Sequence, residues 1–155
     1  GHGVPTNEGD SYLLLNDSNL SDISNSSYLF DEFVEDLGNI SNTKKIVFLD
    51  NVSLTSNENI NKTNIQNKNI VLFESLTKDG KIDNYSKNYE HNIFKYSLIK
   101  GLYIEEDLNM NKKIEVEEIK NYLEKNINEK KLSENKPQMI FKNIDGNEEI
   151  TISTY

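Results

Sequence analysis

The sequence predicts an α/β domain in which helices cover both faces of a mostly parallel sheet. Two short apolar runs, 46–50 and 70–74, each end at an acidic residue, which is typical of strands buried on both faces. Segments with helical spacing of apolar residues lie between and after other strands. Strands that alternate with helices indicate a three-layer α/β/α sandwich. We expect residues 1–144 to form this domain and residues 145–155 to add an edge strand or a tail.

The first half of the chain offers three elements before its longest polar stretch. An apolar run at 12–15 indicates a buried strand. Apolar residues then recur at helical spacing in 30–37, with acidic residues between them, and Gly38 suits the C-cap of that helix. The strand at 44–50 follows. Residues 53–69 are rich in Ser, Asn, Thr and Lys, so we expect a surface loop there.

The second half begins with the strand at 69–74 and a polar stretch, 77–90, that we expect to be a loop. Two helices should follow at 91–102 and 116–128, because apolar residues repeat on one stripe of each. On the second of these helices the stripe consists of Val116, Ile119, Leu123 and Ile127. Pro137 ends helical structure, and a last strand is expected at 138–141. The tail alternates polar and apolar residues at 148–153, which favours an edge strand.

The charge balance argues against nucleic acid as a partner. The chain carries 17 lysines, no arginine and 26 acidic residues, for a net charge of −9, whereas phosphate binding rests on basic clusters. No apolar run reaches the roughly 20 residues that cross a bilayer. We therefore expect no nucleic-acid partner, no membrane contact, and a cytoplasmic location. The sequence has no cysteine, which leaves no thiol nucleophile and no disulfide.

Five short segments occur in an order that is typical of one enzyme family. They are Gly1-His2-Gly3, the strand end at 48–54, the helix at 91–102, the Asp- and Asn-rich stretch at 107–114, and the pair Pro137-Gln138. Together they resemble the caspase and metacaspase family of cysteine peptidases, in its bacterial caspase-like branch. In that family the first segment reads Ser-Gly-His-Gly and the second ends Leu-Asp-Ala-Cys-x-Ser-Gly. The resemblance covers residues 1–141.

The resemblance implies a caspase-like fold with cysteine-type endopeptidase ancestry, in a fragment that lacks the first strands. It assigns His2 to the general-base position, Gly3 to the oxyanion region and Val52 to the position of the nucleophilic cysteine. Nucleophilic catalysis needs a base beside an ionisable nucleophile, and a valine side chain has no ionisable group. We therefore expect a pseudopeptidase, which is either a peptidase-family domain that binds a protein or peptide partner without cleaving it or an inactive paralogue whose sequence is drifting.

An active hydrolase is the first alternative, with Ser53 or a cysteine outside this fragment as nucleophile. Ser53 adjoins Val52 on an extended segment, so its hydroxyl should point to the other side. Asp50 ends the strand and is expected to be a carboxylate satisfied by backbone N–H groups. His91 is expected to be a cap or packing residue at a helix start, and nothing supports a metal site made with His2.

A calcium-responsive binding module is the second alternative. Residues with oxygen ligands fall at positions 1, 3, 5, 7, 9 and 12 of an EF-hand-type loop, namely Asp107, Asn109, Asn111, Lys113 (through its carbonyl), Glu115 and Glu118. Ile114 takes the apolar position 8. Lys112 stands at position 6, where the turn requires a positive φ that is costly for residues other than glycine. Without calcium, the segment is a polar turn that leads into the helix at 116–128. We expect no other cofactor.

Overall fold

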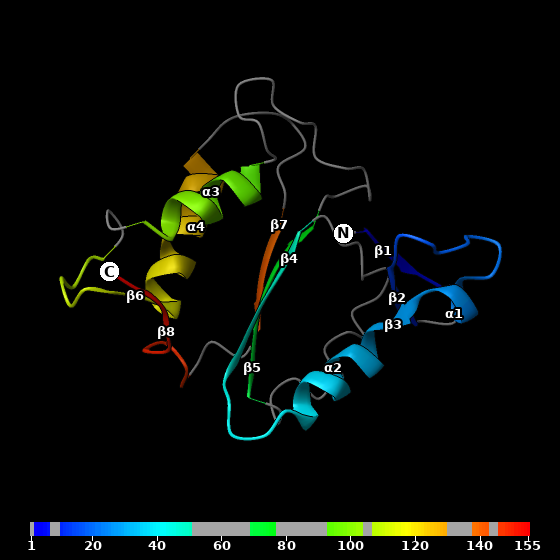
Figure 1. Ribbon diagram of the computed structural model, residues 1–155. Coiled ribbons are helices and arrows are strands. Elements are labelled where there is room, and N and C mark those ends of the chain that lie inside the picture. The colour runs from blue at the N-terminus through cyan, green and yellow to red at the C-terminus, as the bar shows by residue number, and fades with distance from the viewer. Residues whose placement is uncertain are drawn as a thin grey trace.

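The computed structural model describes residues 2–6, 10–50, 69–76, 93–103, 107–129, 138–142 and 146–155. These residues form a mixed α/β fold with small sheets, one of which is partly parallel (Figure 1). The α/β class predicted from the sequence is therefore correct at this coarse level. Among the described helices, none is both long and apolar enough to span a membrane.

The N-terminal part forms a small antiparallel sheet followed by a helix. Its elements are β1 (His2–Pro5), β2 (Ser11–Leu14), α1 (Ile23–Ser26), β3 (Tyr28–Leu29) and α2 (Phe30–Asn39). The strand expected at 12–15 is confirmed as β2, although most of it is half-buried instead of buried. The expected helix is also confirmed, but Gly38 lies inside α2 and Ile40 is its C-cap. The backbone of Ile40 closes the helix with an N–H bond to the carbonyl of Leu37.

The central sheet has the order β4–β5–β7, with β5 in the middle. Its strands are β4 (Lys45–Asp50), β5 (Ile70–Leu76) and β7 (Gln138–Lys142). The β4 and β5 strands are parallel and run in register from Lys45 opposite Ile70 to Asp50 opposite Ser75. On its other side β5 pairs with β7 in the antiparallel direction. All three strands were expected from the sequence, and β5 is buried as predicted, whereas β4 is half-buried.

Helices pack against both faces of β5 because its side chains alternate in direction. On one face Val71 and Phe73 join a core with α3 (Ile93–Gly101) and α4 (Val116–Glu129). On the other face Ile70 and Leu72 pack with α2. The stripe predicted for α4 is confirmed, since its four apolar residues are at most 2% exposed.

Gly101 allows α3 and α4 to approach closely. A Cβ at this position would lie 2.7 Å from Cδ1 of Tyr122 and 3.2 Å from Cδ1 of Ile119. Only glycine leaves enough room for these two side chains at the end of α3. The sequence placed this glycine in the helix at 91–102 without indicating the contact.

The C-terminal segment closes a second small sheet beside α4. There β6 (Lys113–Glu115) pairs with β8 (Thr151–Thr154) in the antiparallel direction. The tail is thus a strand, as expected, and its partner among the described strands is β6. Residues just before β8 also cap α4, since Val116 N–H donates to the carbonyl of Ile150 (3.0 Å) and Glu117 N–H to that of Glu148 (3.1 Å). These bonds satisfy donors that the first turn of a helix otherwise leaves free.

Candidate functional site

The structure places the backbone of His2, the predicted general-base position, at the start of β1. His2 is the first residue of that strand and lies opposite Leu14, while Gly3 lies opposite Leu13. The sequence analysis expected no strand at this point. Val52, Ser53 and His91 lie outside the described residues. The proximity of His2 to the nucleophile position therefore stays a prediction.

The carboxyl ends of β4 and β5 form the edge where a parallel sheet usually carries its functional groups. Asp50 and Ser75 are Cα partners at this edge. Each lies two residues after a phenylalanine, Phe48 or Phe73, that belongs to the core with α3 and α4. Because side chains alternate along a strand, both residues belong to the face of the sheet that packs against these helices. Ser75 is buried.

Glu74 is an unexpected feature of the same edge. Its side chain has no solvent exposure, and neither Oε1 nor Oε2 has a hydrogen-bond partner among the described residues. Burial raises the pKa of this carboxyl to about 7, against a smaller lowering by the positive charge of Lys142. The sequence analysis treated Glu74 as the polar end of a strand. The same pattern of an acid after four apolar strand residues occurs at Asp50, which is half-buried, so the pattern alone does not indicate the burial of Glu74.

In the loop at 107–118, side-chain oxygens accept hydrogen bonds from backbone N–H groups of the same loop. Oδ1 of Asp107 accepts the N–H of Asn111 (3.0 Å), and Oδ2 accepts the N–H of Lys112 (2.8 Å). Asn111 Oδ1 accepts the N–H of Lys113 at 2.8 Å. Lys112 has a φ of 63°, so the backbone adopts the positive φ that position 6 requires although the residue is not glycine.

Glu118 joins the two ends of this loop. Its Oε1 accepts the N–H groups of Leu108 (2.8 Å) and Asn109 (3.3 Å), and its Oε2 accepts that of Glu115 (3.0 Å). The last bond is half of a capping box, since Glu115 is the residue before α4 and Glu118 is the third residue of the helix. Glu118 is only 7% exposed, so these bonds fix its carboxylate.

The two amide side chains of the loop contact Glu115, and Tyr155 contacts Asp107. Asn109 Nδ2 and Asn111 Nδ2 each donate to a carboxylate oxygen of Glu115 at 3.1 Å. The hydroxyl of Tyr155 donates to Oδ2 of Asp107 at 2.5 Å, which lowers the pKa of Asp107. The described residues contain no group of three or more His, Cys, Asp or Glu side chains placed to hold a metal ion.

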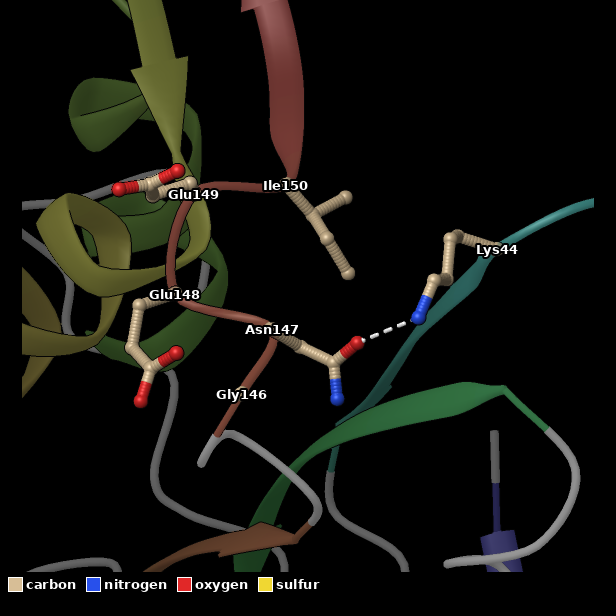
Figure 2. A pocket seen from close by; sticks show the side chains of 6 residues that line it. All are labelled: Lys44, Gly146, Asn147, Glu148, Glu149 and Ile150. Carbon is tan, nitrogen blue, oxygen red and sulfur yellow. Dashed lines mark hydrogen bonds between the residues drawn. The ribbon is translucent and has the colours of Figure 1, made fainter.

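A pocket of about 490 Å³ lies at the opposite, amino end of β4. Its lining residues are Lys44, Gly146, Asn147, Glu148, Glu149 and Ile150. Lys44 Nζ donates to Oδ1 of Asn147 at 2.8 Å, and Figure 2 shows the carboxylates of Glu148 and Glu149 turned away from this pair. The hydrogen bond therefore joins the C-terminal segment to the start of β4 without an ion pair.

Comparison of the chain with protein-family models, with curated proteins and with solved structures found no match.

Proposed function

We propose that this chain is a caspase-like domain that has lost peptidase activity and binds a protein or peptide. The observation that carries the proposal is the parallel pair β4–β5, because Asp50 ends β4 at the edge where such sheets carry functional groups. Val52, two residues later, then occupies the nucleophile position that the resemblance assigns. The packing of α2 on one face of β5, and of α3 and α4 on the other, supports the three-layer sandwich.

The proposed loss of activity follows from the chemistry of position 52. An active relative forms a covalent acyl-enzyme through a thiolate, and the base removes the thiol proton. Valine has no such proton, and the chain has no cysteine at any position. What remains of the proposed site is a base position, a glycine backbone and the carboxyl edge of the sheet, which can bind an extended peptide but cannot attack it.

A peptidase assay tests the loss of activity. We expect no turnover of fluorogenic peptides with either basic or acidic residues before the cleavable bond. Ser53→Ala and His2→Ala are the matched variants. Turnover by the unmodified chain that disappears in either variant would reject the pseudopeptidase and support the active hydrolase that uses Ser53.

A single introduced cysteine tests whether the site is caspase-like. We expect the thiol of Val52→Cys to react with iodoacetamide at pH 6.5 faster than that of Leu20→Cys, which is at a position 69% exposed. A neighbouring histidine lowers the pKa of a thiol and raises its thiolate fraction. Adding His2→Ala should remove the difference. Equal rates in Val52→Cys with and without His2 would place the two positions apart and overturn the assignment.

Calcium binding by the loop at 107–118 is a second candidate function. It is favoured by the positive φ of Lys112 and by the complete burial of Ile114, which anchors position 8 in the core. We expect millimolar CaCl₂, but not the same concentration of MgCl₂, to raise the melting temperature. Binding stabilises a fold by about 2.7 kcal/mol at 100 times the dissociation constant. An unchanged melting temperature, or an equal rise in Asp107→Asn, would reject this function.

A further inference from the structure

The surroundings of Glu74 favour a neutral side chain. In the sheet Glu74 lies between Leu49 of β4 and Ile140 of β7, on the face that Leu72 and α2 share. It has no exposed surface, and neither carboxyl oxygen has a hydrogen-bond partner among the described residues. A buried carboxylate without partners is far less stable than the neutral acid, because it has lost its hydration without compensation.

Lys142 is the described charged group that acts on Glu74. It lies on β7, opposite Leu72, and therefore two residues along the strand from the position that faces Glu74. Its charge favours ionisation of Glu74, but burial has the larger effect and raises the pKa of Glu74. The neighbour on β4 is an uncharged leucine. The charged residues of α2, which are Asp31, Glu32, Glu35 and Asp36, are exposed to solvent instead of facing the sheet.

We propose that Glu74 is a proton-operated switch in the central sheet. In the closed domain Glu74 holds its proton and stays buried. When the proton leaves to solvent, the domain favours a conformation in which the Glu74 carboxylate reaches water. This conformation requires the carboxyl end of β5 to separate from at least one neighbouring element, since β4 and β7 flank Glu74 in the sheet.

The sign of the pH effect follows from the two pKa values. The pKa of Glu74 is about 7 in the closed domain and 4.5 when the side chain is free in water. Below pH 4.5 both states hold the proton, and stability does not depend on this group. Between pH 4.5 and 7 the closed state alone keeps it, so the opening equilibrium constant rises about tenfold per pH unit, or roughly 300-fold in all. Above pH 7 both states are ionised and the effect is constant.

The substitution Glu74→Gln keeps the shape and removes the titration. We expect the unfolding equilibrium constant of the unmodified chain, measured in urea, to rise steeply from pH 5 to 7 and then level off. Relative to it, Glu74→Gln should lack the roughly 300-fold component. Glu32→Gln, at an exposed position of α2, is the matched control and should retain that component. Lys142→Gln should move the upper end of the transition to higher pH.

Two further measurements apply to the unmodified chain, so that the test survives if Glu74→Gln does not fold. In carbon-13 NMR, one glutamate carboxyl resonance should titrate near pH 7. Amide hydrogen exchange in β5, corrected for its intrinsic pH dependence, should accelerate between pH 5 and 7. If every glutamate resonance titrates below pH 5, or if Glu74→Gln and Glu32→Gln show the same pH dependence, the switch is overturned.

Discussion

Glu118→Ala should destabilise the domain more than any other change of a single charged residue in the 107–118 loop. Its carboxylate accepts three backbone N–H groups, from Leu108, Asn109 and Glu115, and is 7% exposed. Hydrogen bonds to charged groups contribute about 1.5–3 kcal/mol each. The bond to Asn109 is long and water can replace part of the loss, so we expect about 3 kcal/mol in total.

Urea unfolding in the presence of a chelator measures this cost without a metal contribution. In thermal unfolding, the melting temperature of a chain of this size should fall by roughly 6–12 °C. Glu117→Ala is the matched control, because Glu117 shares the first turn of α4 but its side chain is 41% exposed and lies 3.8 Å from Lys120. Glu117→Ala should lower the free energy of unfolding by no more than about 0.5 kcal/mol, as expected for an exposed ion pair. Equal costs for Glu117→Ala and Glu118→Ala would refute the claim that Glu118 holds the loop to the helix.

Three further predictions concern other contacts. Phe73→Ala should lower the free energy of unfolding by about 3–5 kcal/mol, since its ring centroid lies 4.8 Å from that of Phe48 and 5.4 Å from that of Phe141. Ile99→Ala, at an exposed site, should lower it little. Equal losses in urea unfolding would contradict the core described above. Gly101→Ala should lower the free energy of unfolding by about 1–3 kcal/mol through the clash with Tyr122. The same substitution should lower it less in a chain that already carries Tyr122→Ala. Additive losses would show that the two residues do not interfere. The hydrogen bond to Asp107 raises the pKa of Tyr155 to about 12, so the component of the tyrosinate absorbance titration near pH 12 should be missing in Tyr155→Phe; an unchanged curve would contradict that contact.

The sequence predicted the elements whose side-chain pattern depends on burial alone. The stripe of α4 and the apolar run of β5 are such patterns, because one core covers each of them and no other force competes. Strand direction was less accessible. The antiparallel pairing of β7 depends on the path of the chain between distant segments, which local hydrophobicity does not encode. Three strands were missed: β3 and β6 have only two and three residues, and β1 contains Gly3 and Pro5, which are uncommon in strands.

The candidate site was predictable only in part for a related reason. Asp50 was correctly placed at the end of a parallel strand, since an acid after an apolar run marks that end. The same pattern at Glu74 has the opposite outcome, because β5 is the middle strand of its sheet and residues on both of its faces are buried. Likewise Lys112 adopts a positive φ that its residue type disfavours, because the side chains of Asp107 and Asn111 hold the surrounding N–H groups. In the first case the neighbouring strands decide the state of the residue, and in the second the side chains of its own loop decide it.

The hydrogen bond between Lys44 and Asn147 joins residues that are 103 positions apart. A ribosome that adds about 5–20 residues per second needs roughly 5–20 s to synthesise Asn147 after Lys44. For that interval the amino end of β4 lacks this partner, and α4, once it is synthesised, still lacks the carbonyls of Glu148 and Ile150 that later cap it. The β6 strand therefore lacks its partner β8 until residues 146–155 have left the exit tunnel. The assembly of this sheet is completed after translation of the strands, during a period in which chaperones have access to their uncovered edges.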